Sequence, residues 1–170
     1  MSAPDSKESE QEFDLLQNSF RRPFFLSFTI GVPFCIFKLL FGLTATRIGA
    51  ETNIFLEIFG WIVVIWAIGD LVLNLGRGIL DLMHRPLPFE YCIIAEVGHY
   101  AKKPMLFLAV DTLLTFSIVC FMLWSFWITR LSLPEAYLWF FATTLNLISL
   151  SLVSVYNEIV FYRANRISTR

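Results

Sequence analysis

Two apolar stretches of this chain contain acidic side chains, which are the residues most able to do chemistry in it. Asp70, Asn74 and Arg77 follow one another at spacings of four and three residues inside the first stretch, so they share one face of a helix. A carboxylate within an apolar span costs several kcal/mol unless it finds a partner or takes up a proton. Asp70 therefore requires a partner from another segment of the chain.

Asp111 and Thr115 repeat the pattern in a second apolar stretch. Asp70 precedes Arg77 by seven residues and Asp111 follows Lys103 by eight, which places both acids roughly 10–12 Å inside the basic boundary of their helices. A further apolar stretch carries small polar residues and ends in Asn157 and Glu158. These two lie slightly closer to the basic boundary than Asp70 and Asp111 do. The polar layer that these depths predict consists of Asp70, Asn74, Arg77, Asp111, Thr115, Asn157 and Glu158.

This predicted polar layer has two interpretations. In the structural one, the side chains bond across helices and set the register of the assembly, with Arg77 neutralising one acid. In the functional one, facing acids in a medium of low dielectric load and release a proton or bind a cation. A binding site for a lipid or another subunit is a third alternative.

A second ion pair is expected nearer the opposite boundary. Lys38 lies within an apolar stretch, and Glu57 lies one turn inside the next one. We expect a Lys38–Glu57 pair between adjacent helices, with separate extension of each side chain to the lipid headgroups as the alternative.

Four apolar segments are long enough to cross a bilayer, which takes roughly 20 helical residues. The predicted fold is an all-α membrane protein, a four-span antiparallel helical bundle with cytoplasmic interfacial amphipathic helices. Residues 1–22 form a polar segment, partly disordered with a short interfacial helix, and residues 163–170 form a basic tail. The expected spans within the bundle of residues 23–162 are 23–46, 54–76, 104–128 and 136–162. The small polar residues of the last span, Ser149 excepted, fall on one side, which we expect to face the interior.

The distribution of basic residues predicts the orientation. The N-terminal segment, the loop 77–103 and the tail hold ten Lys and Arg residues, whereas the two short turns hold two. This bias places both termini and the loop in the cytoplasm, and the cell (inner) membrane is the expected location. Within the loop, one side of an amphipathic helix of about 13 residues should dock a partner or lie on lipid. The residues of that side are Phe89, Ile93, Val97 and Tyr100.

Composition and motifs exclude several classes of function. With 56% hydrophobic and 16% charged residues and a net charge of −1, the 170-residue chain fits neither a soluble domain nor a nucleic-acid-binding protein. His84 and His99 both lie in the loop, so the spans offer no histidine pair for haem, and their spacing with Cys92 matches no metal site. No catalytic motif is present, so we expect no enzyme, cofactor or metal.

The remaining expectation is a small multi-pass membrane protein. We expect it to be an accessory, assembly or scaffold subunit of a larger membrane complex, in contact with membrane lipids and with a membrane-protein partner or further copies of itself. The alternative is a proton or cation transport protein that uses Asp70 and Asp111.

Overall fold

The computed structural model describes residues 27–83 and 92–168, excluding the side chains of residues 156, 157 and 160–168, and every regular element in this part is helical. In chain order the elements are the π-helix η1 (Ser27–Gly31), α3 (Val32–Thr52), α4 (Ile54–Leu82), α5 (Ile93–Tyr100), α6 (Pro104–Trp124), the 3-10 helix η2 (Trp127–Arg130) and α7 (Leu133–Ser168). The predicted helix in residues 1–22, and Phe89 of the predicted docking face, lie outside the described residues.

Four segments of the described part are long and apolar enough to cross a membrane. They are Ser27–Thr52, Ile54–Leu82, Pro104–Trp124 and Leu133–Val155. The predicted class, an all-helical multi-pass membrane protein, is therefore confirmed.

A single residue connects α3 to α4. Asn53 alone lies between them, with an extended backbone, and its side-chain oxygen accepts a hydrogen bond from the backbone N–H of Phe55 at 2.9 Å. The spans predicted at 23–46 and 54–76 leave residues 47–53 as the turn between them, and this prediction is wrong because α3 continues through Gly49 to Thr52. A β-carbon on Gly49 would lie 2.6 Å from Cα of Glu57, so this glycine lets the two helices approach closely enough to form a hairpin.

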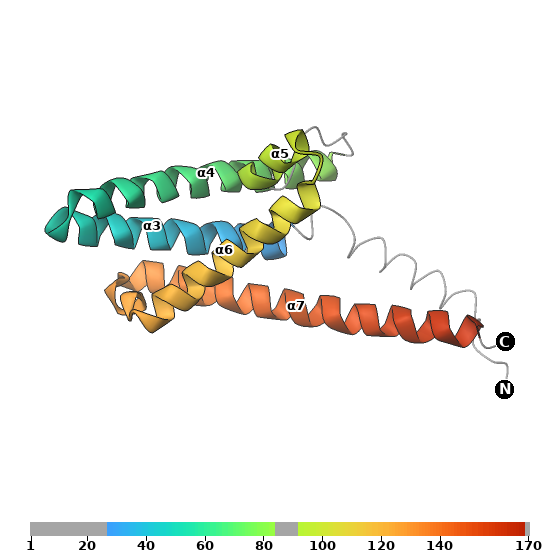
Figure 1. Ribbon diagram of the computed structural model, residues 1–170. Coiled ribbons are helices and arrows are strands. Elements are labelled where there is room, and N and C mark those ends of the chain that lie inside the picture. Colours follow the sequence, from blue (N-terminus) through green and yellow to red (C-terminus); the bar gives the residue numbers. More distant parts are fainter. Residues whose placement is uncertain (1–26, 84–91, 169–170) are drawn as a thin grey trace.

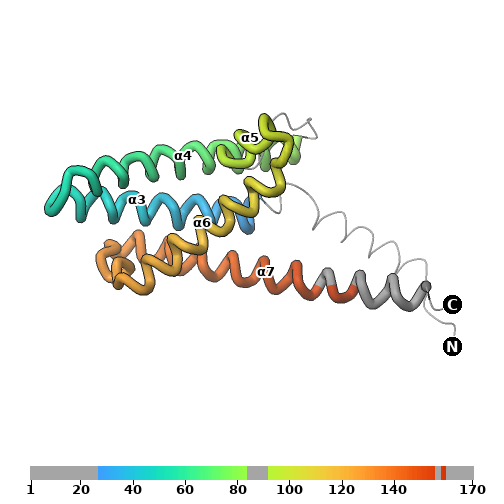
Figure 2. Tube along the Cα trace, viewed as in Figure 1, coloured from blue at the N-terminus to red at the C-terminus, as the bar shows by residue number. Residues whose placement is uncertain are grey.

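Helix α3 lies at the centre of the molecule. In Figure 1 it runs between α4 and α7, with α6 crossing in front of it, and the chain path in Figure 2 shows the same order. Its most apolar window is 61% buried, against 28% or less for each of the other three segments. A side chain on α3 is therefore placed to contact side chains from several helices at once.

The start of the α3 segment is a π-helix. Pro33 has no N–H to continue the helical hydrogen-bond ladder, and the wider turn Ser27–Gly31 directly precedes it. Pro33 is the second residue of α3, so the segment passes from π-helix to α-helix directly beside this proline.

Aromatic side chains fill the half of the molecule next to Asn53 and η2, which we call the turn end. Phe41 packs edge-on against Phe59 and Phe121 and is stacked on Trp127, with ring centroids 5.8–6.1 Å apart. Nearer the middle of the molecule, Phe37 of α3 meets Trp139 of α7, with ring centroids 4.9 Å apart. These aromatic contacts attach α4, α6 and α7 to the central helix.

The buried face of α7 differs from the predicted one. Trp139, Ala142, Asn146 and Ser149 are buried, at spacings of three or four residues. Ser149, which the predicted polar face left out, is buried, whereas other small polar residues of that face, such as Ser151, are exposed. The prediction is wrong because the large Trp139 side chain, packed on Phe37, sets the rotation of α7.

Candidate functional site

A buried lysine joins two buried aspartates from different helices. Nζ of Lys38 on α3 donates to Oδ2 of Asp70 on α4 at 2.7 Å and to Oδ1 of Asp111 on α6 at 2.6 Å. The ammonium group also lies 4.4 Å from the ring centroid of Trp66. The Lys38 side chain is only 1% exposed, so these groups replace the water that would otherwise solvate it. We call Lys38, Asp70 and Asp111 the ion cluster.

The ion cluster corrects the predicted Lys38–Glu57 pair, which is wrong. Asn53 closes a tight hairpin, so residues equally far from it lie at equal depth. Lys38 lies 15 residues before Asn53 and Asp70 lies 17 residues after it, whereas Glu57 follows it by only four. Glu57 is about 16 Å too shallow at 1.5 Å per residue.

Both carboxylate oxygens of Asp70 accept hydrogen bonds. Oδ2 accepts from Lys38, and Oδ1 accepts from the backbone N–H of Ile93, the first residue of α5, at 2.8 Å. The side chain is 1% exposed. Asp70 therefore holds α5 against the span hairpin, and each oxygen of its carboxylate already accepts one hydrogen bond.

Asp111 differs from Asp70 in this respect. Its Oδ1 accepts from Lys38, but within the described residues no donor is found for its Oδ2. Its side chain is 6% exposed, and the residue lines a cavity. Asp111 is therefore the acid of the ion cluster that retains free acceptor capacity.

Asn74 extends the cluster toward the start of α3. Its amide nitrogen donates to the backbone oxygen of Asp70 at 3.0 Å and lies 3.6 Å from Sγ of Cys35. A β-carbon on Gly31 would lie 2.6 Å from Cγ of Asn74, so only a glycine leaves room for this amide. The predicted grouping of Asp70, Asn74 and Asp111 is found in the structure.

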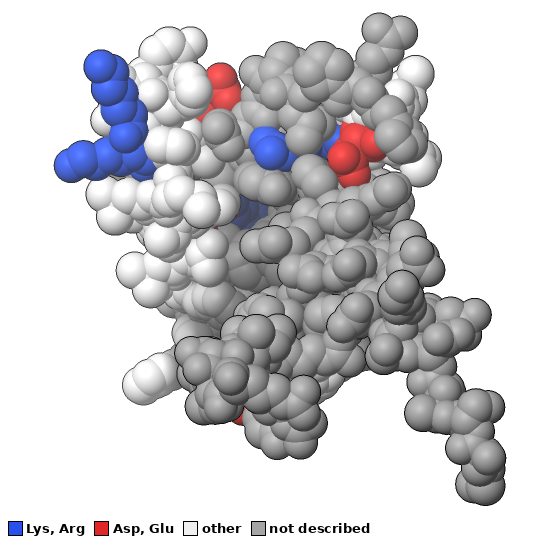
Figure 3. Space-filling view, turned by 90° about the vertical axis from the view of Figure 1, so that its right-hand side faces the viewer, with Lys and Arg blue, Asp and Glu red and all other residues white. Residues whose placement is uncertain are grey.

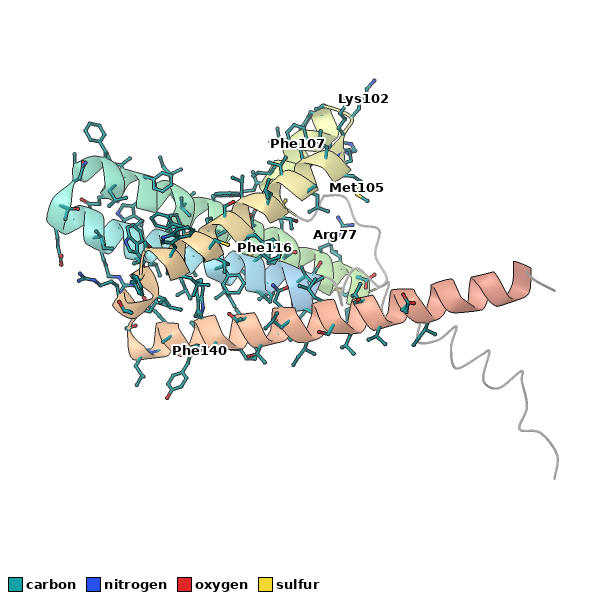
Figure 4. All side chains as sticks on the ribbon, turned by 60° about the horizontal axis from the view of Figure 1, so that its bottom comes forward. Arg77, Lys102, Met105, Phe107, Phe116 and Phe140 are labelled. Atoms are coloured by element: carbon teal, nitrogen blue, oxygen red, sulfur yellow. The ribbon has the colours of Figure 1, made fainter. Side chains whose placement is uncertain are left out.

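A cavity of about 310 Å³ lies beside the ion cluster. Its polar part is formed by the ion cluster and Asn74, and apolar side chains cover much of the rest, including Ile30, Phe34, Met105 and Leu108. Met105, in the first turn of α6, is 79% exposed, so the cavity reaches the surface there. Figure 4 shows Met105 at the same end of the molecule as Arg77 of α4, which we call the loop end.

A second, smaller cavity lies at the turn end. Its volume is about 150 Å³, and Thr44, Arg47, Glu51 and Arg130 contribute to its lining. The buried side chains of Phe37, Leu40 and Phe41 occupy the part of α3 around and between the two cavities. Lys38 and Thr44 are six residues apart, so the apolar barrier is about 9 Å thick.

Only some of the other residues of the predicted polar layer lie beside the ion cluster. Thr115 is buried, and its hydroxyl donates to the backbone oxygen of Asp111 at 2.9 Å. Arg77 is half-buried and takes no part in the ion pairs of the cluster. Glu158 is exposed on α7, so its predicted place in the layer is wrong, and the side chain of Asn157 is not described.

The predicted docking face lies on a shorter helix than expected. Helix α5 spans the eight residues Ile93–Tyr100, and its exposed apolar side chains are Ile93, Val97 and Tyr100 at 38%, 55% and 84%. Its opposite side packs on α6, where a β-carbon on Gly98 would lie 2.6 Å from Phe107. At this end of the molecule, basic side chains project at the upper left of the view in Figure 3.

Cys92 caps α5 next to the cavity. Its Sγ accepts a hydrogen bond from the backbone N–H of Ala95 at 3.4 Å. Burial raises the pKa of the Cys92 thiol to about 12, with the nearby charge of Asp111 acting in the same direction. The thiol is therefore protonated near neutral pH and is a poor nucleophile.

Lys38 is the functional residue whose role the sequence reasoning missed. The signal that would have found it is the hairpin itself, since equal distance from Asn53 places Lys38 opposite Asp70. The sequence contains no comparable pattern that predicts the cavity or the contact between Lys38 and Trp66. No family model, curated protein or solved structure matches this chain, so the site is interpreted from its own geometry.

Proposed function

We propose that this chain transports protons or small cations across a membrane, with Asp111 as the loading group of the ion cluster. In this proposal the four spans form an antiparallel bundle in the cell (inner) membrane. Both termini and the loop 77–103 face the cytoplasm, as the excess of basic residues in these segments favours. The cavity at the loop end then opens toward the cytoplasm.

The observation that carries the proposal is the unequal bonding of the two acids beside a cavity. Both carboxylate oxygens of Asp70 accept a hydrogen bond, from Lys38 and from Ile93, whereas Oδ2 of Asp111 has no donor within the described residues. With both acids ionised, the cluster has a formal charge of −1, and one proton or monovalent cation brings it to zero. A net charge buried in a span is costly, so uptake of that ion is favoured.

The arrangement of the two cavities supports transport over a purely structural role. Each cavity has polar residues in its lining, and the barrier between them consists of apolar side chains, including Leu40 and Phe41. Apolar constrictions of this kind gate ion pathways by excluding water. In this proposal, transport requires the apolar side chains between the two cavities to move apart.

Flux measurements in liposomes test the proposal. With a potassium diffusion potential and a pH-sensitive dye inside, we expect internal acidification that is lost in Asp111→Asn and Asp70→Asn. Glu57→Gln is the matched control, because it removes a carboxylate from the same assembly outside the cluster and should leave flux unchanged. Replacing the proton gradient with sodium or potassium gradients identifies the ion. An absence of flux in the parent protein, or equal flux in Asp111→Asn, contradicts the proposal.

The length of α7 favours a second function, that of an accessory, assembly or scaffold subunit. Helix α7 has 36 residues against 21 in α6, so about 20 Å of it extends beyond the length of α6. In Figure 1 this extension continues past the ends of the other labelled helices at the loop end. A projecting helix of this kind suits contact with a partner protein or a further copy of the chain.

Co-purification in mild detergent tests the subunit function. We expect a partner to be retained with the full-length chain and lost after truncation beyond Val155, which removes the projecting part of α7. A chain that migrates alone at every detergent concentration argues against a subunit role.

A further inference from the structure

The cavity beside the ion cluster has features that neither proton nor metal-ion transport requires. A bare monovalent ion needs little more than the space of a water molecule, which is about 30 Å³. The cavity has a volume of about 310 Å³, many times the space that one water molecule needs. Pockets of this volume lie at the lower end of the range that holds small organic ligands.

The cavity divides into a polar and an apolar part. Ile30 and Phe34 from the α3 segment and Met105 and Leu108 from α6 supply apolar wall, while the carboxylate of Asp111 lies in the polar part. A hydrated inorganic ion would leave this apolar wall in contact with water. A molecule with an aliphatic body and one polar head covers both parts.

The charge of the cluster specifies the head group. Lys38 offsets one of the two carboxylates, which leaves one negative charge and, among the described residues, no donor at Oδ2 of Asp111. An alkylammonium head supplies one positive charge and N–H donors to that oxygen, forming a charge-assisted hydrogen bond. A carboxylate head would add a second negative charge in a buried site, and a neutral alcohol would leave the net charge uncompensated.

We infer that this cavity binds an organic cation, a primary alkylammonium of about six to eight carbons, with its nitrogen on Asp111 and its chain against Phe34 and Leu108. The inference rests on the ion cluster of the proposed function and names the substrate class of that site. The exposed Met105 places the entrance at the first turn of α6, so the amine enters from the loop end with its nitrogen leading.

Direct binding of radiolabelled n-hexylammonium to the purified full-length protein tests this inference. We expect saturable binding that n-hexanol and hexanoate fail to compete for, because neither carries a positive charge. Asp111→Asn should weaken binding at least about tenfold, since one charge-assisted hydrogen bond is lost. Helical content and the midpoint of thermal unfolding are measured for each variant to show that it folds.

A second variant tests the location without altering any charge. Leu108→Trp fills the cavity and should abolish binding, whereas Val110→Trp adds the same side chain on the same helix at an exposed position outside the cavity lining and should retain it. Non-saturable partition into the detergent, unchanged binding in folded Asp111→Asn, or unchanged binding in Leu108→Trp overturns the inference.

The outcomes separate this inference from the proposed function. Ion flux without amine binding leaves the transport proposal standing and removes the organic cation as its substrate. Saturable, Asp111-dependent binding without any flux supports the binding site and contradicts transport.

Discussion

The loop end and the turn end of this molecule differ in the buried contacts that hold the central helix, although Phe34 and Phe116 also form a ring contact near the loop-end cavity. At the loop end, Lys38 is attached to α4 and α6 by ion pairs beside a cavity of about 310 Å³. At the turn end, Phe41 is attached to those helices by aromatic packing. Aromatic packing in an apolar medium stabilises without desolvating any charge, whereas a buried ion cluster stabilises little after desolvation. The cluster and its cavity are therefore the reason that we place the proposed function at the loop end.

The largest effect is expected at the ion cluster. Lys38→Met removes the cation and leaves two buried carboxylates without their shared donor, so the free energy of unfolding should fall by about 3–5 kcal/mol. Unfolding by sodium dodecyl sulfate in mixed micelles measures it. Adding Asp70→Asn and Asp111→Asn to Lys38→Met removes the uncompensated negative charges. The triple variant should therefore regain much of the lost free energy of unfolding. A single variant as stable as the parent would show that the cluster does not hold the helices together.

A smaller loss of stability is expected at the turn end. Phe41→Ala removes a buried ring that contacts Phe59, Phe121 and Trp127. The expected cost is about 2–4 kcal/mol, slightly below the range for soluble cores because lipid is itself apolar. Binding of n-hexylammonium at the loop end should stay unchanged, which sharpens the distinction between the two halves. A parallel loss of binding in folded Phe41→Ala would mean that the halves act as one unit.

An intermediate effect is expected where Asn74 packs against Gly31 at the end of η1. Gly31→Ala places a β-carbon 2.6 Å from Cγ of Asn74 and forces that amide, and with it Cys35 or α4, to move. Overpacking of this kind costs about 1–3 kcal/mol. The double variant Gly31→Ala with Asn74→Ala relieves the clash, so a coupling between the two changes, measured in a double-mutant cycle, identifies the contact. Additive effects would contradict it.

The smallest effect is expected at the exposed ion pair of the turn end. Arg47 donates to both carboxylate oxygens of Glu135 at 2.9 Å, but its side chain is 46% exposed. Arg47→Gln should change the free energy of unfolding by about 0–1 kcal/mol, in contrast to Lys38→Met. The same detergent titration measures the free energy of unfolding of both variants. If Arg47→Gln lowers it as much as Lys38→Met does, buried and exposed charges do not differ in the way expected here.

Much of the site could be predicted from local rules of helix geometry. The predictions that were wrong have identifiable physical causes. The depths of Asp70 and Asp111 follow from their distance to basic residues, because helices advance a constant length per residue. Pairing Lys38 with Glu57 failed because the two depths were not counted from the turn: Lys38 lies 15 residues before Asn53, whereas Glu57 lies only four after it. Placing Glu158 in the layer failed because the rotation of α7 depends on Trp139, a packing contact that no periodicity reports.

Composition and hydrophobic length by themselves determined that this is an all-helical protein with four segments able to cross a membrane, because the cost of burying polar groups in lipid acts on each segment separately. Only the tertiary structure decided which acid meets the lysine, which carboxylate oxygen stays without a donor in the described residues, and where a cavity forms. These features depend on the rotation and crossing of helices, which packing between distant side chains sets. The pattern within one helix is compatible with many such arrangements.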